Sequence, residues 1–75
     1  MTKLPAVKPQ RVIKALERAG FQLDRVSGSH HHFKHPNDPT LFVSVPYHNK
    51  DLKTGTLAAI IKQARMTADE FKNLL

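Results

Sequence analysis

The sequence predicts an α+β fold in which a three-stranded antiparallel sheet carries helices on one face, in the order helix, three strands, two helices. Apolar residues recur at helical spacing in residues 9–19 and again in residues 55–74. Between these segments, three short strand-like runs are separated by residues that form turns. Tight connections between consecutive strands favour an antiparallel meander. The 75 residues, 40% of them hydrophobic, suffice for one small core, so we expect a single domain over residues 1–75.

The first helix is expected over residues 9–19. Pro9 suits the first turn, where a missing N–H costs nothing, and Gly20 suits the residue that ends a helix. Helical spacing predicts that the buried side of this helix consists of Val12, Ile13 and Leu16.

The first strand is expected to begin at Phe21. Phe21 and Leu23 alternate with polar residues, a two-residue period typical of a half-buried strand, and Val26 continues the pattern after a local irregularity. Residues 27–29, Ser-Gly-Ser, should then turn the chain.

Two further strands complete the predicted sheet. The second should begin at His30 or His31 and end at His35, because residues 36–39, Pro-Asn-Asp-Pro, are too rich in turn formers to continue it. The third is expected over residues 41–45 and ends at a proline.

A polar loop, residues 47–53, leads to the second helix. Thr54 is the expected N-cap of a helix over residues 55–64. Its inward face should consist of Leu57, Ile60, Ile61 and Ala64.

A third helix should start soon afterwards. Thr67 and Glu70 have the spacing of a capping box, in which each side chain accepts a hydrogen bond from the other residue's backbone N–H. Phe71 and Leu74 continue the apolar stripe.

The composition favours a polyanion as partner. Twelve Lys and Arg against six Asp and Glu give a formal net charge of +6, and cations that neutralise phosphates gain affinity through counterion release. Without cysteine, neither a disulfide framework nor a thiolate metal site is expected, and a reducing, cytoplasmic setting is favoured. The N-terminus lacks the apolar block of a secretory signal and no apolar run approaches the roughly 20 residues of a membrane span, so we expect a soluble, unprocessed chain.

Four of the five histidines fall within residues 28–35, Gly-Ser-His-His-His-Phe-Lys-His. Alternate residues of a strand point to opposite sides, so if Phe33 is buried under the helices, His31 and His35 share its side. The opposite, solvent side would then present His30, His32 and Lys34.

Histidines placed in this way could cleave RNA without a metal. An unperturbed imidazole titrates near pH 6.5, so it can take a proton from a ribose 2′-hydroxyl or return one to the departing 5′ oxygen. A lysine or a backbone N–H can stabilise the charge that builds on the phosphoryl oxygens. Gly28 would let the backbone approach a phosphate closely, and Ser29 would add a hydroxyl donor beside His30.

Other interpretations of the histidines stay open. An affinity-tag remnant would sit at a terminus, whereas this run lies between two strands. Imidazole also binds zinc and copper, but neighbours in a strand diverge, and cysteines are absent and carboxylates few nearby. His31 and His35 could be ordinary partly buried residues, and His48 could belong to a solvated loop.

An ordered set of short motifs resembles the HicA toxin family of type II toxin–antitoxin systems. The resemblance runs from about Leu4 to Leu75 and centres on the Gly-Ser-His motif of residues 28–30. The other matching positions are residues 16–21, 45–46, 48, 52, 55–57, 60–64, 66–67, 70–71 and 74–75.

The resemblance implies a fold similar to the double-stranded RNA-binding domain. It also implies a metal-independent ribonuclease, without cofactor, that cuts messenger RNA until a HicB antitoxin binds over its site. The functional histidine of the family directly follows Gly-Ser, which assigns the catalytic role to His30, with Gly28 and Ser29 as its companions. Relatives often have glycine where this chain has Arg65, so we expect a different turn, or strain, between the last two helices.

The leading hypothesis is therefore an endoribonuclease toxin, an mRNA interferase, in which His30 is the general base or acid. The residues expected to bind substrate are Gly28, Ser29, His32, Lys34 and Lys50, and Arg25 and Lys53 could extend the basic surface. The general acid stays open between His32, Lys34, His48 and water. Two alternatives are a non-catalytic RNA-binding module of the same fold and a metal-dependent protein that uses the histidine cluster.

Overall fold

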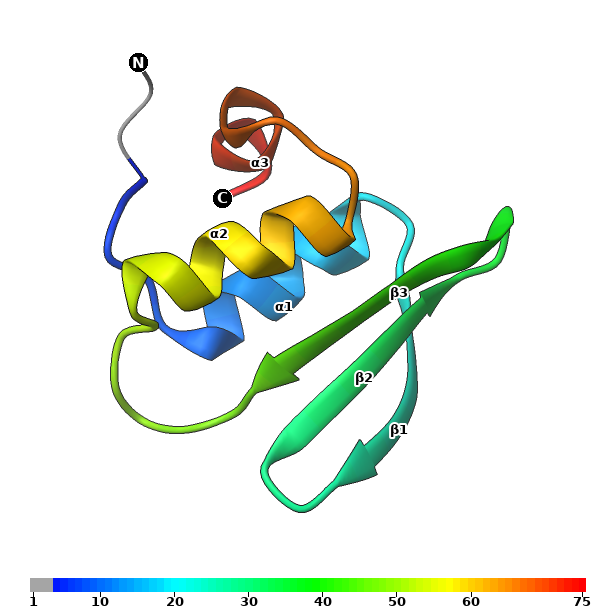
Figure 1. Cartoon of the computed structure of the whole chain (residues 1–75), viewed down its shortest axis with the longest axis horizontal. Helices are drawn as coiled ribbons and strands as arrows, with labels where there is room; N and C mark the ends of the chain where they lie inside the picture. The colour runs from blue at the N-terminus through cyan, green and yellow to red at the C-terminus, as the bar shows by residue number, and fades with distance from the viewer. Residues whose placement is uncertain (1–3) are drawn as a thin grey trace.

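The computed structural model describes residues 4–75 and has the predicted element order α-β-β-β-α-α (Figure 1). The α+β fold class is therefore confirmed. The expectation about a secretory signal falls partly on residues 1–3, which lie outside the described residues. The elements are α1 (Pro9–Arg18), β1 (Gln22–Ser27), β2 (His30–His35), β3 (Asp38–Pro46), α2 (Thr54–Gln63) and α3 (Ala68–Leu74).

The three strands form one antiparallel meander in the order β1-β2-β3. Opposite Phe33 of β2 lie Leu23 of β1 and Val43 of β3. A bulge between Leu23 and Arg25 inserts Asp24 as an extra residue into β1. Because directly paired residues point to the same side of a sheet, this register fixes which side chains share a face.

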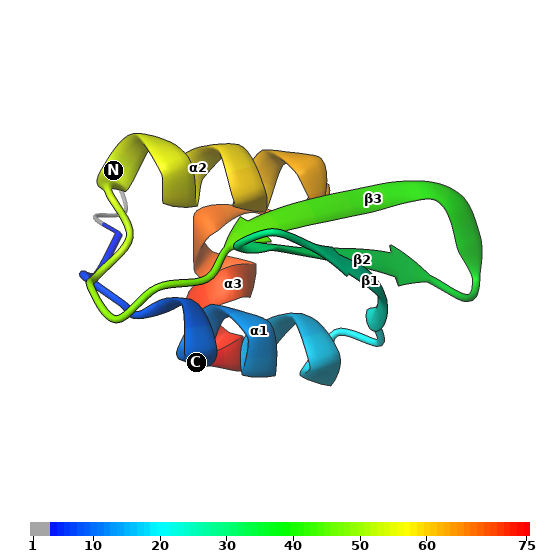
Figure 2. The same cartoon turned by 90° about the horizontal axis from the view of Figure 1, so that it is seen from below.

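The core lies between one face of the sheet and the helices. Phe33 is 1% exposed and Val43 is fully buried, and both pack with buried residues of the helices, such as Leu16 and Phe71. Figure 1 shows the helices gathered beside β3, with β1 as the strand farthest from them, and Figure 2 shows the strands extending beyond the helices. The predicted inward face of α2 is confirmed, because all four of its residues are buried: Leu57, Ile60, Ile61 and Ala64.

The prediction that the first strand is half-buried is wrong. All six residues of β1 are exposed, and Leu23 and Val26 each keep 52% of their surface in solvent. Both point to the same side as Phe33, but the helices contact the sheet mainly at β3 and do not extend over β1. Phe21, from the same pattern, is buried, but it precedes the strand and packs edge-on against the ring of His35.

The two helix starts differ in their caps. Thr54 is the first residue of α2 and not its N-cap, which is Lys53 without a side-chain cap hydrogen bond, so this prediction is wrong. The capping box of α3 is confirmed: Glu70 N–H donates to Thr67 Oγ1 at 3.1 Å, and Thr67 N–H donates to Glu70 Oε1 at 2.8 Å.

Arg65 ends α2 in a left-handed conformation, with φ of +57°. Its N–H donates to the carbonyl of Lys62, and the N–H of Met66 donates to that of Ile61, which is the hydrogen-bond pattern of a Schellman motif. The chain therefore keeps the turn that glycine would favour and accepts the strain of a side chain there.

Replacing Arg65 with glycine should raise the free energy of unfolding by about 1 kcal/mol, because a side chain in this conformation costs about 1–2 kcal/mol. Arg65 also lies 3.7 Å from Asp38, an exposed ion pair that contributes little. Arg65→Ala is the matched control, since it loses the ion pair and keeps the strain. Equal stabilities of the Gly and Ala variants in chemical denaturation would contradict this account.

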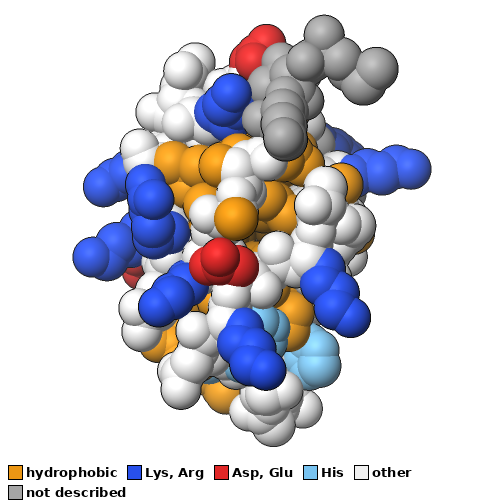
Figure 3. All heavy atoms as spheres, turned by 90° about the vertical axis from the view of Figure 1, so that its left-hand side faces the viewer, with side chains coloured by type: hydrophobic (Ala, Val, Ile, Leu, Met, Phe, Trp, Pro, Cys, Tyr) orange, Lys and Arg blue, Asp and Glu red, His pale blue; other side chains and the backbone are white. Residues whose placement is uncertain are grey.

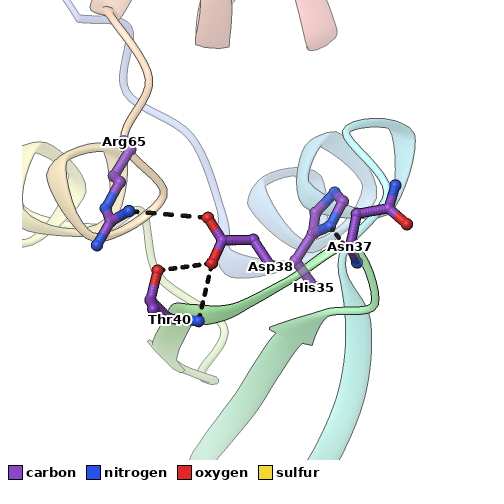
Figure 4. A network of polar contacts seen from close by, with 5 residues as sticks. All are labelled: His35, Asn37, Asp38, Thr40 and Arg65. Atoms are coloured by element: carbon purple, nitrogen blue, oxygen red, sulfur yellow. Dashed lines mark hydrogen bonds and ion pairs between the residues drawn. The ribbon is translucent and has the colours of Figure 1, made fainter.

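Asp38 organises the start of β3 (Figure 4). Its Oδ1 accepts hydrogen bonds from Thr40 Oγ1 at 2.6 Å and from Thr40 N–H at 2.9 Å, while its Oδ2 faces Arg65. The Thr40 hydroxyl, then the Thr40 backbone N–H, and then the charge of Arg65 hold the pKa of Asp38 below its ordinary value.

The lowered pKa of Asp38 should change how the stability of the protein depends on pH. A carboxyl whose pKa is lower in the folded state contributes stability above its unfolded pKa, near 4, and loses it as the pH falls through the folded pKa. Below about pH 4, the wild type should therefore lose stability more steeply than the Asp38→Asn variant. Unfolding curves measured from pH 6 downward for both proteins would test this, and parallel curves would contradict it.

Candidate nucleic-acid interface

The side of the sheet away from the helices, here called the open face, carries one histidine row. Its β2 residues are His30, His32 and Lys34, which lie opposite Pro46, Ser44 and Phe42 of β3. On the other side of β2 they pair with Ser27, Arg25 and Gln22 of β1. The alternation predicted from a buried Phe33 is thus present in the structure.

Three rings stand nearly parallel across the open face. The centroids of His30 and His32 are 6.3 Å apart with an interplanar angle of 19°, and those of His32 and Phe42 are 5.6 Å apart at 21°. His32 Nδ1 is hydrogen-bonded to Ser44 Oγ at 2.8 Å, which fixes the orientation of the central ring. Sequence reasoning missed Phe42 and Ser44, although their outward position follows from the alternation with the buried Val43 and Val45.

The turn between β1 and β2 places His30 at the edge of the open face. Gly28 has φ of +58°, a conformation that favours glycine, and a Cβ at this position would meet no atom within 4 Å. The carbonyl of Ser29 accepts a hydrogen bond from Tyr47 N–H at 2.6 Å, which ties the turn to the end of β3. The space in front of Gly28 is therefore open to a ligand.

The Lys34 cation of the open face already has an acidic partner. Lys34 Nζ lies 3.4 Å from Asp24, and both side chains keep access to solvent. Lys34 is also four residues along the strand from His30, roughly 13 Å at the rise of a β-strand. The two side chains are therefore placed to contact different phosphate groups of a bound strand.

The other two histidines of the cluster lie on the helix side and have structural contacts. His31 stacks on Tyr47 with a centroid distance of 4.5 Å, and its buried Nδ1 has no hydrogen-bond partner among the described residues. His35 Nε2–H donates to the carbonyl of Ala19 at 3.0 Å, and its Nδ1 accepts a hydrogen bond from Asn37 N–H at 3.1 Å. These contacts support the interpretation of both as packing residues.

A shallow pocket of about 350 Å³ lies beyond the end of β3. Its lining includes Lys50 and His48, and Lys50 N–H donates to His48 Nδ1 at 3.2 Å. Pro46, which pairs with His30, also lines it, so the pocket adjoins the His30 end of the open face. Lys50 thus lines this pocket from the segment after β3 and is not on the strand that carries the histidine row. The full lining is Pro46, His48, Lys50, Asp51, Leu52, Lys53 and Thr56.

Positive charge is spread over one side of the molecule. Figure 3 shows Lys and Arg side chains spread over the side that lies at the left in Figure 1, with few acidic side chains between them and histidines near the lower edge. Within residues 4–75, no group of three or more His, Asp or Glu side chains could hold a metal ion, and no helix is long and apolar enough to cross a membrane.

Together, the fold and this surface define a small basic α+β protein with an open sheet face that carries exposed imidazoles. The family described as the HicA toxin of bacterial toxin–antitoxin systems matches residues 9–66. The chain belongs to the HicA toxin family and is thus the toxin component of a toxin–antitoxin system. A comparison with curated proteins finds no match.

Proposed function

We propose that the protein is a metal-independent endoribonuclease that cleaves messenger RNA in the cytoplasm, with His30 as the proton-transfer group. The observation that carries the proposal is the position of His30. Its ring is exposed at the edge of the open face, it directly follows the open turn at Gly28, and within residues 4–75 no hydrogen bond occupies either of its ring nitrogens. An imidazole placed in this way is free to exchange a proton with a bound ribose.

The proposed reaction is an internal displacement at phosphorus. His30 takes the proton of the 2′-hydroxyl, the 2′ oxygen forms a bond to the adjacent phosphorus, and the bond from phosphorus to the 5′ oxygen breaks. An acid returns a proton to that oxygen, so the products end in a 2′,3′-cyclic phosphate and a 5′-hydroxyl. His32 is our first candidate for the acid, because its ring lies beside that of His30 and Ser44 holds its orientation.

The basic residues would position the RNA. Lys34 and Arg25 flank the histidine row on the open face, and Lys50 lines the adjoining pocket. Because Lys34 is far along β2 from His30, it would bind a phosphate other than the one being cleaved. The Gly28–Ser29 turn would let the scissile phosphate approach the backbone closely.

The test is incubation of the purified protein with RNA in excess chelator, followed by analysis of the product ends. We expect cleavage that the chelator leaves unchanged and products with 2′,3′-cyclic phosphates. Cleavage that needs added zinc would favour the metal-dependent alternative. Binding with a steep salt dependence but without products would favour the non-catalytic RNA-binding module.

We also propose that a HicB antitoxin covers this basic surface and supplies carboxylates to it. Opposite charges on the two partners would speed their association and make its rate fall with salt. Acidic substitutions at Lys34, Lys50 and Lys53 should therefore lower the association rate, as measured at two salt concentrations. Unchanged affinity and salt dependence would show that the antitoxin docks elsewhere.

A further inference from the structure

Phe42 is an exposed aromatic residue in the middle of β3. Its side chain is 43% exposed, although the neighbouring Val43 is fully buried. Phe42 makes no contribution to the buried core, and it lies directly opposite Lys34 on the open face. A flat apolar ring beside a cation matches the chemistry of a ligand that has both a flat ring and a negative charge.

Contacts with neighbouring side chains hold the ring of Phe42 in place. It stacks against His32, and His32 is hydrogen-bonded to Ser44 at 2.8 Å. The backbone N–H of Ser44 in turn donates to Gln63 Oε1 at 3.2 Å, which links this part of β3 to the end of α2. A ligand that stacks on these rings therefore meets side chains that need little reordering.

We propose that Phe42 and His32 form a stacking platform for an unpaired base, so that the RNA segment bound on the open face is single-stranded. This inference rests on the proposed function, since it names the form of RNA that reaches His30. A nucleobase in a duplex already has both of its faces stacked and cannot use the platform, whereas a base in a single strand can. The phosphate of the same nucleotide can contact Lys34, which pairs with Phe42.

The arrangement also predicts how selective the contact is. Every base has a flat π-face, so stacking on Phe42 contributes affinity with little preference for one base. The stacked nucleotide is separate from the cleaved linkage, because Phe42 lies opposite Lys34, four residues along β2 from His30. Loss of the Phe42 ring therefore weakens binding and leaves the side chains of His30 and His32 in place.

The experiment measures binding of the wild-type chain and its variants to 2′-O-methyl RNA, which lacks the attacking hydroxyl and stays intact. A single strand and a blunt duplex of the same sequence are compared by fluorescence anisotropy. We expect the single strand to bind more tightly than the duplex. Phe42→Ala should weaken single-strand binding about 10-fold, because one base loses its stacking partner. Phe42→Tyr keeps the ring and should stay within about 2-fold of the wild type.

Three comparisons separate stacking from other effects. Phe42→Ala should leave the salt dependence unchanged, whereas Lys34→Gln should reduce its slope by about 0.7, the value for one lost phosphate contact on a single strand. Leu23→Ala is the matched control, because Leu23 is equally apolar and exposed but points to the helix side. A duplex that binds as tightly as the single strand, or a Phe42→Leu variant that binds like the wild type, would overturn the inference. Because no cleavage is measured, these outcomes do not depend on whether His30 is catalytic.

Discussion

Alanine in place of His30 is expected to lower the rate of RNA cleavage by about 10³-fold, within the 10²–10⁴-fold range that general acid–base catalysis supplies. The His30 side chain is exposed and has one ring contact, with His32, so the free energy of unfolding should change by less than about 0.5 kcal/mol. Single-turnover cleavage of a defined RNA measures the first quantity, and urea unfolding measures the second.

His35→Ala is the matched control from the same strand. Its ring bonds to Ala19 and Asn37 and packs on Phe21, so its removal should cost about 1–3 kcal/mol of stability. Cleavage per folded molecule should stay near that of the wild type. A His30→Ala variant that still cleaves at the wild-type rate would place the catalytic group elsewhere on the molecule.

Gly20→Ala is expected to destabilise the fold by about 3 kcal/mol, a large share of the stability of a domain this small. Gly20 follows α1 with φ of +98°, which side chains rarely adopt. A Cβ there would lie 2.7 Å from His35 Nε2, the atom that donates to the carbonyl of Ala19. The variant therefore adds backbone strain and displaces a ring that closes the end of the helix.

Gly55→Ala provides the comparison for Gly20→Ala. Gly55 lies in the first turn of α2, where a Cβ would meet no atom within 4 Å. Alanine there should stabilise the protein by about 0.5–1 kcal/mol, because glycine is the poorer helix former. Thermal unfolding of the two variants should shift in opposite directions, and similar shifts would refute the special role of Gly20.

Local sequence patterns predict most of the fold. The helical spacing before Gly20, the turn formers after His35 and the capping box at Thr67 each act over a few residues, so their consequences can be predicted without a structure. The same holds for the two sides of β2. Once Phe33 is taken as buried, the period of a strand decides which histidines face away from it. Thr54 was misplaced as a cap because helix ends shift easily by one residue.

Contacts between distant parts of the chain determine two features that no local pattern predicts. These are the exposure of β1 and the row formed by the rings of His30, His32 and Phe42. Leu23 and Val26 have the pattern of a half-buried strand, but burial also needs a helix above them, and the helices dock mainly on β3. The pattern within a strand cannot tell how far a helix reaches across a sheet. For the same reason the sequence does not predict the ion pair between Lys34 and Asp24, which depends on a bulge in the neighbouring strand.

Neighbouring residues and composition are thus sufficient to predict the order of the elements, the alternation that exposes His30 and the excess of positive charge. Contacts between distant residues, in contrast, leave β1 uncovered, bring Phe42 into one row with His30 and His32, and place Lys50 in the pocket beyond β3. Strand register and helix docking bring together residues that are far apart in the chain. A periodic pattern within one element does not specify those contacts.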